Sequence, residues 1–334
     1  MNNNSLRART MAITGIGGFI GLRMAERALE RGMRVQGLDA VAAAADLARQ
    51  KGAEVVVGDV TDKDAVTRAS RGADIMFHTA AVVEEDGERA LYQRVNVEGT
   101  RTVAEAARAA GVRHFVQISS VMVYGFTYPP FVAEDGPFRG EGNPYCETKL
   151  ASDRLVLGLH APGSFDVTVI RPGDVYGPRS RPWVLRPLEL MRKHMFCLID
   201  GGRGTMNHVH VDNLLDAVFL ALEQGAGGEA FNVTDGGKTT FAEYFGHLAR
   251  MLGRKRLPSA PGALVRSVFS LAGRAGALIG IRLPVSPAAV DFVSRPHPYS
   301  IARVRRELGY EPRISLEQGM AEVERALRAA GQLT

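Results

Sequence analysis

The chain has 334 residues, of which 46% are hydrophobic and 23% are charged, and its formal net charge at pH 7 is +5. This is the composition of a globular protein with one large domain or two coupled domains, and it excludes a disordered or collagen-like chain. The basic residues are dispersed, so we expect no nucleic-acid partner. No apolar run reaches the length of a membrane span. The two cysteines, Cys146 and Cys197, give no disulfide framework, which favours a cytoplasmic location.

The first half of the chain alternates short apolar strands with helices. Residues 1–9 are polar, and we expect a loose tail there rather than a secretory signal. Strands are predicted at 10–14, 35–38, 54–57, 74–78, 114–120 and 167–171, and helices at 19–31 and 88–110. Apolar strands joined by helical crossovers predict an α/β fold with a parallel sheet covered on both faces.

The second half is less regular. Residues 178–187 are rich in proline and arginine and are predicted to form a loop. Residues 209–223 indicate a short strand that leads into a helix, and 231–233 a late strand of the same sheet. The tail over 301–330 returns to helical patterning. We assign residues 10–178 and 209–235 to the sheet domain, and 179–208 and 236–334 to a smaller, mostly helical substrate-binding domain.

A glycine-rich turn follows the first strand and opens the first helix. Gly15, Gly18 and Gly21 are three residues apart, and glycine lets the backbone approach a pyrophosphate at a helix N-terminus. Asp39 ends the second strand, where a carboxylate can accept hydrogen bonds from ribose hydroxyls and repel a 2′-phosphate. Asp59 follows the third strand, where the adenine should lie. The sequence therefore predicts a dinucleotide site that prefers NAD to NADP.

A tyrosine and a lysine share one face of a predicted helix. Asn143 and Pro144 are typical of a helix start, and Tyr145 and Lys149 are four residues apart. A phenol has a pKa near 10, and a nearby ammonium lowers that pKa by stabilising the phenolate. The pair can therefore remove a proton from an alcohol or give one to a ketone oxygen. Ser119 and Ser120 end the fifth strand, at the sheet edge where α/β proteins bind ligands.

Together these features resemble the extended short-chain dehydrogenase/reductase superfamily over nearly the whole chain, and most closely its 3β-hydroxysteroid dehydrogenase-like branch. The segments that carry the resemblance are TGIGGFIG at 14–21, GDV at 58–60, HTAA at 78–81, NVEGT at 96–100, SSVMVYG at 119–125, YCETK at 145–149, RPGDVYGP at 171–178, HVHVDN at 208–213 and LGYEP at 308–312. The resemblance implies a Rossmann-like, doubly wound sheet with bound NAD. It also implies a homodimer that pairs through the helices at about 88–110 and 144–160.

The resemblance also assigns residues to roles. The catalytic residues would be Ser120, which orients the substrate oxygen, Tyr145, which moves the proton, and Lys149, which tunes Tyr145 and holds the ribose. A hydride would pass between the nicotinamide and the substrate carbon. The cofactor would contact Gly15, Gly18, Phe19, Ile20, Gly21, Asp39, Asp59, Val60, Ala80, Ala81, Asn96, Ser119, Tyr145, Lys149, Pro172, Gly173 and Val175.

The residues around these motifs favour a hydrophobic small-molecule substrate. Val121 and Met122 follow Ser120 where a dehydratase would carry acidic residues. No arginine immediately precedes Val209, where an epimerase would hold a diphosphate. The apolar stretch 264–283 is consistent with a core helix pair, a lid over an apolar substrate, or a segment resting on a membrane surface.

Two other functions stay open. A nucleotide-sugar 4-epimerase that retains its NAD is the first, because Arg179, Arg181 and Arg186 could bind the diphosphate. A non-catalytic dinucleotide sensor is the second, although such a protein has no need for the Tyr145–Lys149 pair. His208 and His210 lack a third ligand, so no metal site is predicted.

Overall fold

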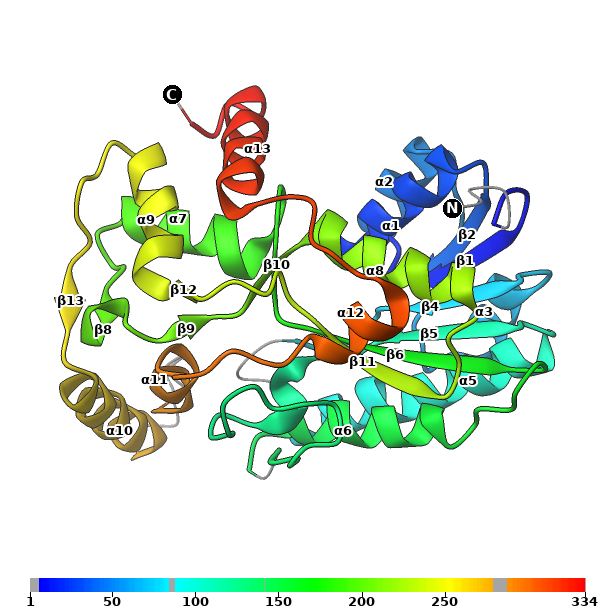
Figure 1. Cartoon of the computed structure of the whole chain (residues 1–334), viewed down its shortest axis with the longest axis horizontal. Coiled ribbons are helices and arrows are strands. Elements are labelled where there is room, and N and C mark those ends of the chain that lie inside the picture. The colour runs from blue at the N-terminus through cyan, green and yellow to red at the C-terminus, as the bar shows by residue number, and fades with distance from the viewer. Residues whose placement is uncertain (1–5, 84–87, 141, 279–286, 334) are drawn as a thin grey trace.

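The computed structural model describes residues 6–83, 88–140, 142–278 and 287–333. Figure 1 shows a lobe built on a sheet beside a smaller, mostly helical lobe. The strands of the sheet are β1 (Thr10–Thr14), β2 (Arg34–Asp39), β3 (Glu54–Val57), β4 (Ile75–His78), β5 (His114–Ile118), β6 (Asp166–Pro172) and β11 (Glu229–Val233). They lie in the order β11-β6-β5-β4-β1-β2-β3, and every neighbouring pair is parallel. The predicted Rossmann-like fold is confirmed.

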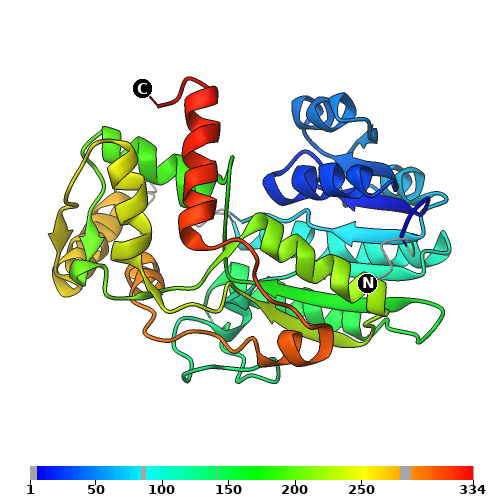
Figure 2. The ribbon, with the colours of Figure 1, turned by 45° about the horizontal axis from the view of Figure 1, so that its top comes forward.

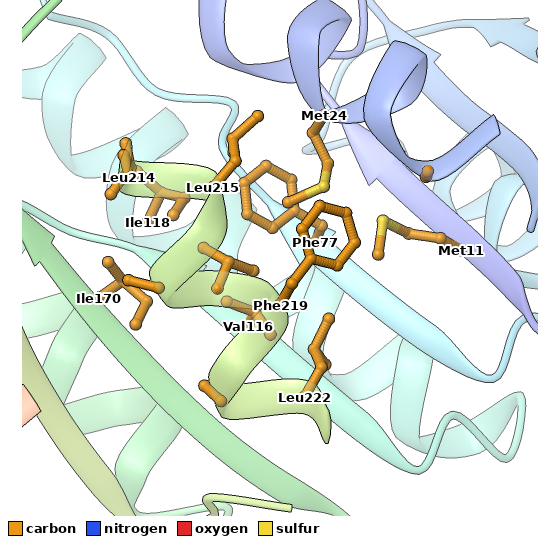
Figure 3. Packing of buried hydrophobic residues seen from close by; sticks show 14 of the residues in the cluster. Met11, Met24, Phe77, Val116, Ile118, Ile170, Leu214, Leu215, Phe219 and Leu222 are labelled. Carbon is orange, nitrogen blue, oxygen red and sulfur yellow. The ribbon is translucent and has the colours of Figure 1, made fainter. Parts of the chain in front are cut away.

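Helices cover both faces of this sheet because its strands are apolar on both sides. In β1, Met11 and Ile13 belong to one buried cluster and Ala12 to the other. The helices α1 (Phe19–Glu30), α8 (Val211–Gln224) and α12 (Ala302–Leu308) pack on the first face. The helices α3 (Lys63–Ser70), α5 (Thr100–Ala109) and α6 (Pro144–Leu157) pack on the second. Figure 3 shows Phe219 and Leu215 of α8 directed at the sheet, close to Phe77.

The second lobe has a core of its own. Its helices are α7 (Arg186–Arg192), α9 (Phe241–Met251), α10 (Gly262–Leu278), α11 (Pro287–Val293) and α13 (Leu316–Ala329), and its strands are β8 (Leu198–Ile199), β9 (Thr205–Met206), β12 (Thr239–Thr240) and β13 (Ser259–Ala260). Leu188, Phe241, Tyr244, Leu248 and Val323 are buried together between these elements. The parallel pair β7 (Asp174–Tyr176) and β10 (His208–His210) runs between the lobes.

Three segments differ from the sequence-based predictions. The loop predicted at 178–187 is wrong from Arg181 onward, where a π-helical turn, η3 (Arg181–Leu185), leads into α7. Pro182 and Pro187 stand at the starts of these helical segments, where a missing N–H breaks no helical hydrogen bond. Leu6 of the predicted tail is buried in the first cluster. Finally, α12, assigned by sequence to the second domain, packs on α8 and β11 because Val304 and Leu308 are apolar.

The helix predicted at 88–110 has three parts. A short α4 (Arg89–Tyr92) is followed by a π-helical segment, η1 (Gln93–Gly99), and then by α5. Wider turns of this kind are often found at functional sites, because they change the direction in which side chains point. Asn96 lies in the π-helical segment, close to the carboxyl ends of the strands.

The close approach of α1 to the preceding turn gives a test of the fold. A Cβ atom added at Gly21 would lie 2.2 Å from the carbonyl oxygen of Gly15. We therefore expect Gly21→Ala to destabilise the protein by about 1–3 kcal/mol, since backbone would have to move. Thermal unfolding measures this. Gly246→Ala in α9 is the control, because its Cβ would meet nothing closer than 3.5 Å, and its melting temperature should stay equal or rise. Equal melting temperatures for both variants would contradict the packing described here.

Candidate active site

The glycine-rich turn forms a cradle at the start of α1. Gly15 has φ +66°, a conformation that favours glycine, and its N–H donates to the Leu38 carbonyl at 2.8 Å. The helix begins after Gly18, and no side chain caps it. Its first N–H groups are therefore directed at the space in front of the turn, where an anion can accept from them. Phe19 and Ile20, in the first turn, are half-buried against the adjacent core.

Asp39 joins the end of β2 to this cradle. Its Oδ2 accepts from the N–H of Gly17 at 2.9 Å, and its Oδ1 accepts from the N–H of Val41 at 3.0 Å. The carboxylate is buried, and each oxygen has capacity for a second hydrogen bond. The structure thus places Asp39 beside the glycine turn, and its contact with a ribose stays a prediction. Asp59 is exposed, and its Oδ1 accepts from Thr61. Val60 beside it is buried.

The opposite wall of the cradle follows β4. Ala80 and Ala81 are half-buried, and the backbone of Ala80 lies against Gly15. The Asn96 side chain accepts from the N–H of Val82 at 2.7 Å and donates to the Val82 carbonyl at 3.1 Å. It also donates to Thr148 Oγ1 on α6. Asn96 therefore fixes this wall to the helix that carries Tyr145 and Lys149.

His78 was missed by the sequence analysis. It ends β4, is fully buried, and lies within hydrogen-bond distance of Thr14 Oγ1 (2.5 Å) and Thr100 Oγ1 (3.0 Å). Burial, with a contribution from Lys149, lowers the pKa of His78 to about 3, so the ring stays neutral. The signal was available, because the imidazole begins the HTAA segment and ends a buried strand.

Tyr145 and Ser120 meet at the carboxyl edge of the sheet. Asn143 caps α6 by accepting from the N–H of Cys146, and Pro144 occupies the first turn, as predicted. Ser120 caps the short helix η2 (Val121–Tyr124) by accepting from the N–H of Met122 at 3.2 Å. Burial raises the pKa of Tyr145 to about 12, whereas a hydrogen bond with the Ser120 hydroxyl lowers it.

Lys149 lies beneath the tyrosine and is buried. Its Nζ donates to the carbonyl oxygen of Ile118 at 3.0 Å and lies 6.0 Å from the centroid of the Tyr145 ring. Burial lowers the pKa of this ammonium to about 8, while Asp153 raises it. The net shift of Tyr145 is upward rather than downward as expected, because burial of the phenol outweighs every favourable contact it makes.

A buried carboxylate that the sequence analysis missed supports Lys149. Asp153 is four residues further along α6 and accepts from Arg171 Nε at 2.9 Å. Arg171 also donates to the Tyr124 hydroxyl and to the Glu134 carbonyl. The hydroxyl of Tyr124 in turn donates to Asn232 Oδ1 on β11. The i, i+4 spacing of Lys149 and Asp153 was the available signal.

The remaining predicted cofactor residues lie at the ends of β5 and β6. Ser119 is buried, and its N–H donates to the Ile170 carbonyl at 2.8 Å. Pro172 ends β6, and the N–H of Gly173 donates to Val233 at 3.0 Å. Val175 is half-buried in β7. These positions share the carboxyl edge of the sheet with Ser120, although Val175 lies one step further toward the second lobe.

Aromatic and apolar side chains adjoin the catalytic segment. Met122 follows Ser120 by two residues, and Arg295 Nη1 lies 3.9 Å from its sulfur. The guanidinium of Arg295 stacks on Phe292, 3.9 Å from the ring centroid. Phe292 also stacks on Trp183 of η3 at 5.7 Å and meets Phe126 edge-on at 6.3 Å. Three separate segments thus bring half-buried aromatic rings together beside Ser120.

The cation within this aromatic group is neutralised. Arg295 is fully buried, and its Nη2 donates to both carboxylate oxygens of Asp174 at 3.1 and 2.8 Å. Met206, just before β10, is buried in the core of the second lobe. The side chain of Asn207 donates to the His297 carbonyl and accepts from the N–H of Tyr299. Arg295 is paired with Asp174, and Met206 and Asn207 are uncharged. None of these three residues therefore presents a free cation to a diphosphate. Arg179, Arg181 and Arg186, the last of which begins α7, are exposed.

The two histidines of β10 have structural partners. His208 lies between Asp235 and Thr239 at 2.9 Å from each, and His210 caps α8 by accepting from the N–H of Asp212. Over residues 6–83, 88–140, 142–278 and 287–333, no group of three histidine, cysteine or acidic side chains is arranged to hold a metal ion.

Comparison with known proteins gives consistent results. The sequence model of the NAD dependent epimerase/dehydratase family matches residues 11–234 of this chain. A ketoreductase of 4-hydroxy-2-methyl-3-oxo-4-farnesyl-3,4-dihydroquinoline-1-oxide from Stigmatella aurantiaca is 30% identical over 96% of both chains. A 3-beta-hydroxysteroid dehydrogenase from Mycolicibacterium neoaurum is 31% identical over 93% of this chain and 89% of its own.

A solved structure extends the likeness to the fold. A double mutant of dTDP-glucose 4,6-dehydratase from Streptomyces venezuelae, with NAD bound, superposes with a TM-score of 0.75. It is 26% identical, and the match covers 95% of this chain and 96% of that one. The family match and this NAD-bound structure support a nicotinamide dinucleotide as the cofactor.

The buried ammonium gives a test of the site by stability alone. The pKa of Lys149 falls from 10.5 to about 8 on folding, so below pH 8 the folded state carries a charge that burial disfavours. Between about pH 8 and 10.5, Lys149 is deprotonated in the folded protein but still protonated in the unfolded chain. The free energy of unfolding of the wild type therefore increases with pH relative to that of Lys149→Met. The melting temperature of the variant minus that of wild type should therefore decline as the pH rises through this window.

Differential scanning calorimetry across this pH range measures the difference. Lys193→Met is the matched control, because Lys193 is exposed and its removal changes no buried charge. The difference in melting temperature between Lys193→Met and wild type should not change with pH. The same flat profile for Lys149→Met would show that Lys149 is not a buried cation.

Proposed function

The chain belongs to the NAD dependent epimerase/dehydratase family, and we propose that within it the protein is a dehydrogenase/reductase that interconverts a secondary alcohol and a ketone on a bulky, sterol-like or lipid-like substrate. The proposal has two parts: a Ser–Tyr–Lys centre that moves a proton, and an apolar pocket that selects the substrate. The names of two relatives, a hydroxysteroid dehydrogenase and a ketoreductase of a farnesylated quinoline, support both parts.

The cradle fits a dinucleotide. The uncapped start of α1 would hold the pyrophosphate, because the first N–H groups of the helix donate to no capping side chain and no Cβ fills the turn. Asp39 would accept from the adenosine ribose hydroxyls, and Lys149 would donate to the nicotinamide ribose. The preference for NAD over NADP rests on the carboxylate of Asp39, which a 2′-phosphate would meet in a buried setting. When bound, the nicotinamide supplies the hydride acceptor or donor.

The proton is handled by the residues of the chain. With its pKa near 12, Tyr145 holds its proton at neutral pH and can donate it to a developing alkoxide. Ser120, whose hydroxyl lowers the pKa of the phenol, would bind the same substrate oxygen and fix its direction. In the oxidative direction Tyr145 must lose the proton, and the ammonium of Lys149 beneath it stabilises the phenolate.

The observation that carries the substrate class is the aromatic group beside Ser120. Phe126, Trp183 and Phe292 are half-buried and offer apolar surface, and each Å² of it that binding buries contributes about 25 cal/mol. The Arg295 guanidinium is occupied by Asp174, so it adds no free positive charge. A nucleotide sugar would need fixed cations for two phosphates, which this pocket lacks among the described residues.

The first test is turnover across substrate classes. Purified protein with NAD should oxidise sterols or long-chain secondary alcohols and should not turn over UDP-sugars. Tyr145→Phe should lower kcat by about 10²–10⁴-fold, because the general acid–base is lost, while NAD binding measured by calorimetry changes little. Epimerised UDP-sugar, with NAD retained through gel filtration, would favour the 4-epimerase instead. NAD binding without any turnover would favour a sensor.

The second test concerns cofactor choice. Wild-type kcat/KM should be higher with NAD than with NADP, and Asp39→Ser should narrow the ratio by weakening NAD and relieving repulsion of the 2′-phosphate. Asp39 also holds the N–H of Gly17, so the melting temperature of the variant is measured alongside. Asp59→Ser is the control, since this exposed carboxylate faces Thr61 and its loss should leave the ratio unchanged. A wild type that prefers NADP would contradict the assignment.

A further inference from the structure

A row of large apolar side chains on α10 faces solvent. Leu264, Val268 and Leu271 are 59%, 51% and 66% exposed. Their spacing of four and three residues places them on one side of the helix. Val265 and Phe269, which point elsewhere on the helix, are half-buried. A contiguous row of this kind is unusual on a monomer and marks a surface that another apolar phase covers.

The helix is held so that this row remains outside. Arg266 on α10 pairs with Asp291 on α11 through two hydrogen bonds of 3.1 and 2.6 Å. This pair fixes the flank of α10 to the second lobe. Figures 1 and 2 both place α10 at the end of the molecule farthest from the seven-stranded sheet. The described part of the stretch 264–283 is therefore not a core helix.

Cations precede this helix on the same end of the molecule. Arg254, Lys255 and Arg256 follow α9, and no described acidic side chain forms an ion pair with them. Gly262 is six positions after Arg256, so the two residues lie within about 22 Å of each other. With Arg250 these cations line a groove of about 680 Å³ between α9 and the segment that follows it.

We propose that this surface, the exposed row of α10 together with the cations at 254–256, docks on an anionic lipid bilayer. The apolar row would enter the boundary between headgroups and acyl chains, and the cations would contact lipid phosphates. Both components match a bilayer surface, whereas an apolar protein partner would leave the cations unpaired. None of the described helices has the length and apolar content to cross a bilayer, so the contact is peripheral.

The position of α10 connects this surface to the pocket. Asp291, which holds Arg266, is followed directly by Phe292 of the aromatic group. A substrate dissolved in the bilayer would thus lie next to the helix pair that walls the pocket. The delivery of substrate from the bilayer rests on the proposed function, whereas the binding of the protein to lipid does not.

The experiment is vesicle flotation with the full-length protein. Vesicles of phosphatidylcholine alone are compared with vesicles that also contain phosphatidylglycerol, at low and high salt. We expect binding to the anionic vesicles that weakens with salt. Leu264→Ser with Leu271→Ser should weaken it by about tenfold or more, since two buried leucines are lost. The control is Leu47→Ser with Val57→Ser, two exposed apolar residues of the sheet lobe, which should bind as wild type does.

A second set of variants tests the charges. Replacing Arg254, Lys255 and Arg256 together by glutamine should also weaken binding at low salt, by about 100-fold if each cation near the surface contributes about fivefold. Replacing the exposed Arg68, Arg71 and Arg108 by glutamine removes the same net charge from the sheet lobe and should have little effect. Melting temperatures confirm that every variant is folded.

Three outcomes would overturn the proposal: no flotation of the wild type, equal flotation of test and control variants, or an α10-dependent dimer in solution that does not bind vesicles. Turnover of a detergent-dispersed substrate separates this proposal from the proposed function. The α10 variants should retain that turnover. Absence of turnover in the wild type would reject the proposed function and leave the flotation result unaffected.

Discussion

The buried ammonium of Lys149 is the constraint around which the site is arranged. A cation removed from water is unfavourable unless its charge is compensated. Here Lys149 Nζ donates to the Ile118 carbonyl, and the charge of the Asp153 carboxylate favours the ammonium. Asp153 needs a counter-charge of its own and finds it in Arg171 on β6. The contacts of Lys149 and Asp153 thus fix the position of α6 against β5 and β6, which are adjacent strands. This position places Tyr145 near Ser120.

The turn between β6 and β7 provides one partner to each of two buried ion pairs. Arg171 pairs with α6 of the sheet lobe, and Asp174, three residues later, pairs with Arg295 after α11. Pro172 and Gly173 between them lie at the predicted nicotinamide position. Breaking either pair would leave a buried charge unmatched, which is strongly destabilising. Charge pairing therefore holds the segment from Arg171 to Asp174 at both of its ends.

The sequence was sufficient for the sheet, the glycine turn and the start of α6, because these depend on local signals. Periodicity located the strands of the sheet, and Asn143-Pro144 marked the first turn of α6. The helix at 181–192 was missed because its prolines suggest a loop unless they are known to occupy first turns. Asp153 and His78 were missed although local signals were present, the i, i+4 spacing from Lys149 and the start of HTAA. Arg295 was missed because its partner, Asp174, is distant in the sequence. The predicted homodimer and the individual cofactor contacts stay predictions.

The Asp174–Arg295 pair also bears on how this pocket can change through evolution. A pocket for a charged substrate would require the guanidinium to be released, and the simplest route is to neutralise position 174. That single change leaves a fully buried cation without a counter-charge, and changing position 295 alone leaves a buried anion. Both positions must therefore change together, or after a stabilising substitution elsewhere. The proposed preference for uncharged substrates would thus be protected by the stability of the fold, and relatives that bind charged substrates should differ at both positions.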